Sequence, residues 1–288
     1  MKDFIITTEL TADLPDEYVM EHNLRIIPLY YKFDDEVIYG DEVNLEPHEF
    51  YEKMRGGAMP TTMACNPEYV ENCFRNILDA GADVLHIAFS SALSSSCSTA
   101  YMVAEQLKSE YPAAKIIVID SKSASMGQGL LVDKAVKQKE KGKSIDEIAE
   151  WLENNKLHLC HQFTVDDLFH LHRGGRVSRA TAIVGTLINV KPVLHVDNEG
   201  ALVSLNNVRG RKKAINSLVD SMIKETEGYE NDTIFISHGD CIEDAEYLAE
   251  KVKEKTGITN IYINYVCPTI GAHSGPGTLA LFFLGEHR

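Results

Sequence analysis

Four short segments of the chain place hydroxyl, arginine, histidine and glycine residues directly beyond apolar runs. In the first two, Thr61 and Thr62 are adjacent, and serines crowd residues 90–98, among them Ser94 and Ser95. Hydroxyls can donate to an oxyanion, and the free N–H groups at the start of a following helix attract an anion as well. The alternatives are a turn with capping threonines at Thr61–Thr62 and a long serine-rich helix cap at 90–98.

The other two segments, residues 173–179 and 271–278, contain glycines that allow tight turns, and the first of them also carries positive charges. Arg173, Arg176 and Arg179 surround a Gly-Gly pair, which lets a turn take positive φ. Three arginines in an acidic chain predict a local site for an anion or a partner, with a solvated basic loop as the alternative. His273 lies among three glycines and a proline in residues 271–278. This composition predicts a tightly shaped loop whose imidazole could donate to a carboxylate.

Common catalytic and metal-binding motifs do not match the chain. Residues 271–275 place serine one position too late for G-x-S-x-G, and no G-x-x-x-x-G-K-[ST] phosphate loop is present. The histidines and cysteine between 158 and 172 fit no zinc spacing. We therefore predict no metal and no cofactor. An enzyme that uses the serine-rich segment, a phosphotransferase or hydrolase, is kept as an alternative hypothesis.

Composition narrows the class of partner. The formal net charge of the 288 residues is −15, which disfavours nucleic acid as a partner. The six cysteines are scattered and include no C-x-x-C pair, so reduced thiols in the cytoplasm are the simpler interpretation. The start of the chain does not resemble a signal peptide, and no stretch is long and apolar enough to predict a transmembrane helix.

The first half of the chain alternates strand-like and helix-like segments. Nearly continuous apolar runs are typical of strands covered on both faces. Helix starts are marked by Asn66-Pro67-Glu68 and by the capping-box spacing of Ser144 and Glu147. This alternation predicts an α/β domain with a doubly wound, mostly parallel sheet, in which ligands bind at the carboxyl ends of the strands. The expected strands are 4–8, 25–31, 84–89 and 115–119, with helices 66–80 and 144–155.

The second half has a different pattern. Residues 193–196 and 201–203 flank Asp197-Asn198-Glu199-Gly200, which is a hairpin signal. A hairpin within a sheet implies antiparallel pairing, so we expect an α+β domain with a mixed sheet. We place the domains at residues 1–155 and 156–288. The other expected elements are strands 163–165, 233–237, 261–266 and 279–283, with helices 211–225 and 243–256.

Taken together and in this order, these segments resemble the DegV family over nearly the whole chain. The closest stretch is Leu168–Ser178, which is similar to the family's L-x-x-L-x-R-G-G-R-[IV]-S pattern. Further matches are Thr11–Pro15, Asp120-Ser121 with Ser125, Gly127 and Gly129, Gly185–Leu194, Gly200, Arg209–Ala214, and Gly271–Gly277. The chain departs from the family pattern at Glu9-Leu10, at Met63 and at Ser95, where the family has Asp-Ser, serine and glycine.

The resemblance implies two domains with a long-chain fatty acid between them, its acyl chain in an apolar tunnel. By position, the carboxylate would meet Thr62, Ser94 and His273, with Thr61 and Ser95 as second choices and Arg211 nearby. It also implies a non-enzymatic carrier that presents the fatty acid to a separate fatty acid kinase, and Arg173, Arg176 and Arg179 are candidates for docking that partner. Because of the departures, another amphiphilic anion is kept as an alternative ligand.

Overall fold

The computed structural model describes residues 2–34, 37–166, 168–178 and 189–288. Its first sheet is entirely parallel and has the strand order β2-β1-β6-β7. The strands are β1 (Phe4–Glu9), β2 (Arg25–Ile27), β6 (Asp83–Ala88) and β7 (Ile116–Asp120). All six residues of β6 are buried, as its unbroken apolar run predicts.

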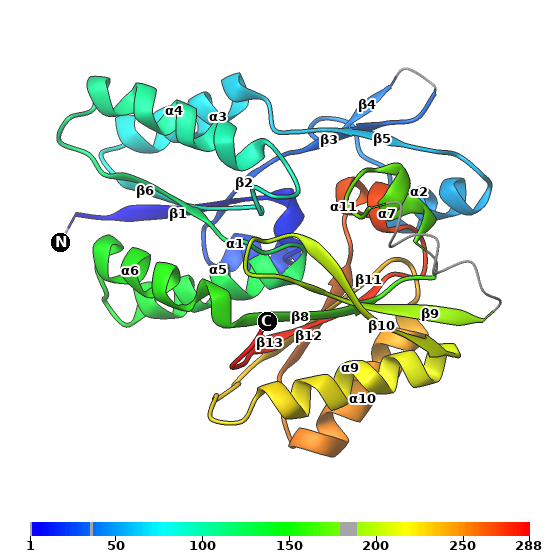
Figure 1. Cartoon of the computed structure of the whole chain (residues 1–288). Helices are drawn as coiled ribbons and strands as arrows, with labels where there is room; N and C mark the ends of the chain where they lie inside the picture. Colours follow the sequence, from blue (N-terminus) through cyan, green and yellow to red (C-terminus); the bar gives the residue numbers. More distant parts are fainter. Residues whose placement is uncertain (1, 35–36, 167, 179–188) are drawn as a thin grey trace.

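Helices cover both faces of this sheet (Figure 1). On one face, α3 (Pro67–Asp79) and α4 (Ser96–Glu110) share a core with Val84 of β6. On the other face, Leu85 packs with α1 (Asp16–Glu21), α5 (Met126–Glu140) and α6 (Ile145–Asn155). The Asn66 cap and the Ser144–Glu147 capping box are confirmed. The short 3₁₀ helices η1 (Leu10–Ala12) and η2 (Lys156–His158) follow β1 and α6.

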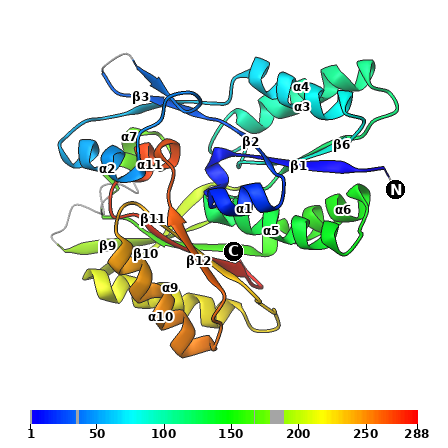
Figure 2. The same cartoon turned by 180° about the vertical axis from the view of Figure 1, so that it is seen from behind.

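The second sheet has the order β10-β9-β8-β13-β11-β12 and is mixed, since only β11 and β12 pair in parallel. Its outer face is covered by α9 (Arg211–Glu225) and α10 (Ile242–Thr256). Its inner face meets α5, which therefore lies between the two sheets (Figures 1 and 2). The strands are β8 (Leu159–Thr164), β9 (Val190–Val196), β10 (Leu202–Arg209), β11 (Ile234–His238), β12 (Ile261–Tyr265) and β13 (Leu279–Leu284).

These two sheets confirm the predicted fold class, a parallel α/β part followed by a mixed α+β part. The proposed boundary after residue 155 falls between α6 and β8. The largest core cluster contains residues from both sides of that boundary, including Leu152 and Phe163. Within the described ranges, no helix has both the length and the apolar character needed to cross a membrane.

Three sequence expectations were wrong. The run 25–31 is not one strand, because Pro28 separates β2 from β3 (Tyr30–Lys32), which joins a different sheet. Thr61–Met63 is not a loop but strand β5, which pairs with β3; β4 (Ile38–Tyr39) lies on the other side of β3. The glycine-rich segment around His273 is largely helical, since α11 (Pro268–Ser274) starts on a proline and ends at Gly275 with φ 81°.

The small sheet β4-β3-β5 forms its own aromatic core with α2 (Pro47–Arg55). Tyr31, Phe50 and Tyr51 are fully buried there, and Ala272 of α11 belongs to the same cluster. The Tyr51 hydroxyl donates to the Val266 carbonyl oxygen at 2.8 Å. This packing holds β5 against α11, and α7 (Phe169–Arg173) contacts α11 as well.

Candidate functional site

A cavity of about 270 Å³ lies where the parallel sheet meets the mixed sheet. Three of its lining residues come just after the carboxyl ends of parallel strands: Thr11 after β1, Ser94 after β6 and Ser125 after β7. This is the edge at which open α/β sheets bind ligands, as the sequence predicted. The volume is close to the lower end of the range for small-molecule sites.

Most of the cavity wall is apolar. The mixed sheet contributes side chains from β8, β9, β10 and β13, and the segments after β2 and β12 add two more. Removing an alkyl chain from water into such a wall stabilises a complex by about 0.8 kcal/mol per CH₂ group. The apolar side chains include Leu29, Phe163, Val196, Leu202, Val266 and Phe282.

His273 and Thr62 lie together at a polar end of the cavity. Thr62 Oγ1 is 2.7 Å from His273 Nε2, so β5 and α11 bring together residues that are 211 positions apart. Burial lowers the pKa of His273 to about 4, and the charges of Arg176 and Arg173 act in the same direction. The imidazole is therefore neutral near pH 7. In the described part of the chain its buried Nδ1 has no partner, so we place the proton on Nε2, which leaves the Thr62 hydroxyl free to donate to a ligand.

Arg173 and Arg176 tie the polar segments to one another. Arg173 Nη2 donates to the carbonyl oxygens of Pro60 at 3.0 Å and Ala272 at 2.9 Å. Arg176 donates to the Leu93 carbonyl oxygen through Nε and Nη2, at 3.2 and 2.8 Å, and to the Gly174 carbonyl oxygen through Nη1. The turn between them thus links the segments that carry Thr62, Ser94 and His273. The hydrogen bonds of these two arginines explain why the four polar segments lie close together.

Among the described residues that line the cavity, Arg176 is the one with a formal positive charge. Its bonds use three of the five guanidinium N–H groups and leave two available. Burial lowers the pKa of Arg176, but an arginine remains charged at neutral pH. Within the described ranges it forms no ion pair with a carboxylate. Arg176 is partly buried, and a cation in such a place with no carboxylate beside it is unfavourable, so this end of the cavity favours an anionic ligand.

The serine-rich segment precedes the 15-residue helix α4. Ser94 lines the cavity, and its Oγ accepts from the Ser96 backbone N–H at 3.2 Å and lies 2.9 Å from Ser96 Oγ. Ser95 also lines the cavity and is exposed. Ser94 therefore accepts from the first N–H group of α4 and also lines the cavity, and its role toward a ligand stays a prediction.

The glycine at position 174 provides a direct test of the histidine's role. Its φ is −74°, so alanine fits the backbone, but the added Cβ would overlap the His273 ring at Nδ1. We expect Gly174→Ala to displace the imidazole and break its contact with Thr62. Thr62, no longer held by the imidazole, would then lose its own hydrogen bond to the carboxylate. A bond to a charged group is worth roughly 1.5–3 kcal/mol, so carboxylate binding should weaken about 10- to 150-fold in a titration.

Gly175→Ala is the matched control. Its φ of 74° disfavours a side chain, yet nothing lies within 4 Å of the added Cβ. This variant should lose about 1 kcal/mol of stability and keep its ligand affinity. Equal affinities in both variants would show that the position of His273 does not matter for binding.

Not every predicted site residue reaches the cavity. Thr61 is exposed and lies outside the lining. Arg211 also lies outside it, with Nε 2.7 Å from Asp244 Oδ2. Arg179 lies outside the described residues. The roles predicted for these residues, and the partner docking predicted for Arg173 and Arg176, stay predictions.

Sequence reasoning missed a buried polar chain in the cavity wall. Ser125 and Ser237 line the cavity, with their Oγ atoms 2.7 Å apart, and Ser125 also donates to Asp13 Oδ2. Asp13 Oδ1 accepts from the Cys267 N–H at 3.1 Å. Ser125 has φ 55° and ψ −147°, which is strained for a residue with a side chain. Asp13 and Ser125 fall in stretches that match the family, but nothing in their spacing predicted this contact.

His161 was also missed as a cavity residue. It is 1% exposed and lines the cavity. Its Nε2 accepts from the Ala124 N–H at 3.1 Å, and its Nδ1 lies 3.3 Å from the Leu159 carbonyl oxygen. Burial holds the pKa of His161 well below its usual value, so the ring is a neutral part of the wall.

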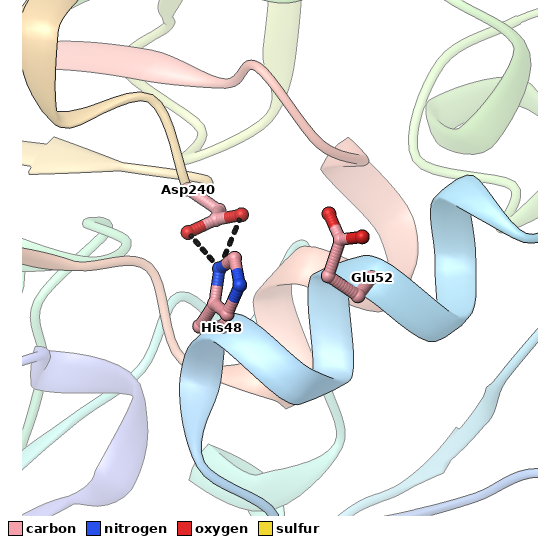
Figure 3. Close-up of side chains that lie close together, drawn as sticks. All are labelled: His48, Glu52 and Asp240. Carbon is pink, nitrogen blue, oxygen red and sulfur yellow. Dashed lines mark hydrogen bonds and ion pairs between the residues drawn. The ribbon is translucent and has the colours of Figure 1, made fainter.

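A second polar cluster lies away from the cavity, where His48 and Glu52 of α2 face Asp240 after β11 (Figure 3). Their ligand atoms lie within 4.8 Å of one another, as a metal site would require. However, Arg55 bonds Asp240 and also Glu52, at 2.7 Å, so its guanidinium already neutralises these carboxylates. Burial raises the pKa of Asp240, but the bonds from Arg55 and His48 outweigh it and lower the pKa below 3.8. We interpret the cluster as a clamp between α2 and the mixed sheet.

The fold defines an α/β protein with two main sheets and a cavity between them. The family model described as an uncharacterised protein of the DegV family matches residues 3–286. A DegV domain-containing protein of Clostridium perfringens is 43% identical over 289 residues, which cover 100% of this chain and 99% of the relative. A Lactococcus lactis DegV domain-containing protein, YteA, is 36% identical, with 98% of each chain covered. The chain belongs to the DegV family.

Solved structures agree with this assignment. A DegV family protein from Thermus thermophilus, described by its fatty acid binding, has a TM-score of 0.88 and 30% identity, covering 99% of this chain and 100% of its own. DegV from Bacillus subtilis, described as a fatty acid binding protein, has a TM-score of 0.85, 30% identity and the same coverage.

Proposed function

We propose that this protein binds one long-chain fatty acid, with the acyl chain along the apolar wall and the carboxylate at Arg176, Thr62 and Ser94, while His273 orients the Thr62 hydroxyl. The observation that carries the proposal is the charge of Arg176, which lines an otherwise largely apolar cavity with two N–H groups to spare. A carboxylate supplies the missing negative charge and accepts bonds from the neighbouring hydroxyls. The fatty acid binding described for the T. thermophilus and B. subtilis proteins supports this choice of ligand.

Mass spectrometry of the protein purified from a bacterial host tests this proposal. We expect the native mass to exceed the denatured mass by one lipid, and the released molecule to extract as a fatty acid. The reason is that a buried acyl chain dissociates slowly once many methylenes are removed from water. A native mass without any excess, unchanged after fatty acids are added, would contradict the proposal.

We further propose that this chain presents the bound fatty acid to a separate fatty acid kinase in the cytoplasm. The chain itself would then catalyse no reaction. The family resemblance suggests this partner. The exposure of Ser95, next to the proposed carboxylate position, supports access by a second protein. The six free cysteines fit a reducing compartment. With ATP and fatty acid, acyl phosphate should form only after a kinase is added, and formation by this chain alone would refute the proposal.

A further inference from the structure

One hydroxyl in the cavity lining is not accounted for by the fold. Ser274 lines the cavity and is 6% exposed, and its Oγ is buried with no hydrogen-bond partner among the residues that the structure describes. The other lining hydroxyls differ in this respect. Partners within the protein are available to Thr11 (Gln128 Oε1), Ser237 (Ser125 Oγ), Thr269 (Cys267 Sγ) and Thr278 (the Gly275 carbonyl oxygen).

Helix α11 places Ser274 next to His273, near the proposed carboxylate position, but on a different row of side chains along the helix. The residues of α11 that line the cavity are Thr269, Ile270, His273 and Ser274, a spacing that defines one helical face. Thr269 and His273 form one row of this face, and Ile270 and Ser274 form the other. Ser274 therefore shares its row with an apolar residue that suits an acyl chain. A serine hydroxyl can turn to a ligand atom by rotation about a single bond.

The proposed carboxylate does not need Ser274. Two carboxylate oxygens offer about four acceptor sites. Arg176 has two N–H groups to spare, and Thr62, Ser94 and Ser95 add hydroxyls. These five donors are more than enough for the acceptor sites. An unsubstituted alkyl chain, however, would leave the Ser274 hydroxyl buried and unpaired, which is unfavourable.

We infer that Ser274 binds an oxygen atom carried on the acyl chain, and that the preferred ligand is a fatty acid with a hydroxyl group along its chain. This inference rests on the proposed function, since it assumes that the carboxylate lies at Arg176. A chain hydroxyl satisfies Ser274 as donor or as acceptor, which a methylene cannot do. Sites that hydrogen-bond a ligand hydroxyl discriminate strongly against the analogue that lacks it.

The test compares stearic acid with a series of monohydroxy stearic acids that differ in the position of the hydroxyl. Dissociation constants are measured by titration of delipidated protein. For the unchanged chain we expect at least one isomer to bind about tenfold more tightly than stearic acid. In Ser274→Ala that preference should vanish, while stearic acid binds as tightly as before or more tightly. Ser109→Ala, at an exposed position near the end of α4, should keep the preference.

Each result has a separate meaning. If no isomer exceeds stearic acid in the unchanged chain, the inference is wrong and fatty acid binding still stands. If Ser274→Ala weakens stearic acid and the hydroxy acids equally, Ser274 serves the carboxylate, which also overturns the inference. If no fatty acid binds at all, the proposed function itself fails. Folding of Ser274→Ala is checked by urea denaturation, where the loss of an unpaired hydroxyl should not lower stability.

Discussion

Arg176→Gln should bind fatty acids roughly 10- to 150-fold more weakly than the unchanged chain. The substitution removes the formal positive charge from the cavity lining and with it charge-assisted bonds worth roughly 1.5–3 kcal/mol. Burial lowers the pKa of Arg176, which means that the protein holds this charge at a cost when no anion is bound. The apo protein also loses the bonds of Arg176 to the Leu93 and Gly174 carbonyl oxygens, so its stability is measured by urea denaturation alongside the affinity. Isothermal titration with delipidated protein measures the affinity.

A fatty alcohol of the same chain length is the matched ligand control. Its head group is neutral, so its affinity should change much less than that of the acid. If acid and alcohol lose affinity equally, Arg176 acts through its bonds to the Leu93 carbonyl oxygen and shapes the serine-rich segment. That result would remove the observation on which the carboxylate assignment depends.

Much of the fold could be predicted because its signals are local. The apolar run of β6 reports burial on both faces, and the capping box of Ser144 and Glu147 involves residues three positions apart. The strand β5 gave no comparable signal. It has three residues, and its pairing with β3 depends on an aromatic core that includes Ala272, more than two hundred residues away.

The candidate site was predictable by residue type but not by arrangement. Thr62, Ser94 and His273 were expected near one another, and the structure brings all three to one cavity. The arginines were expected to dock a partner, since a sequence shows their charge and not the carbonyl oxygens they bind. Apart from Gly174, those oxygens belong to residues 83 to 113 positions away, such as Leu93 and Pro60. Contacts at that separation depend on the assembled fold.

Replacing Asp13 by asparagine should change how the free energy of unfolding depends on pH. Asp13 is 5% exposed, and burial raises the pKa of its carboxyl group from 3.8 to about 7, although bonds from Ser125 and Cys267 oppose the shift. Asparagine can accept from the Cys267 N–H and donate to Ser125, so it mimics the protonated acid. Urea denaturation of both chains at a series of pH values measures the difference.

The sign follows from proton binding. Between pH 3.8 and about 7 the unfolded chain has released the Asp13 proton, while the folded chain still holds it. The stability that Asp13 contributes is thus fully present below pH 3.8 and is lost as the pH rises to about 7, by about 4 kcal/mol in all. From pH 5 to pH 8 the variant should gain about 3 kcal/mol relative to the unchanged chain, and then gain no more.

A parallel pH profile for the two chains would mean that Asp13 is ionised in the folded protein at pH 5, so that its bonds outweigh burial. The two cases also differ at Ser125, whose single proton can serve only one acceptor. With Asp13 protonated, the acid donates to Ser125 and Ser125 is free to donate to Ser237; with Asp13 ionised, the proton of Ser125 goes to the carboxylate. The stability profile therefore also reports which way the hydroxyls in the cavity wall are oriented.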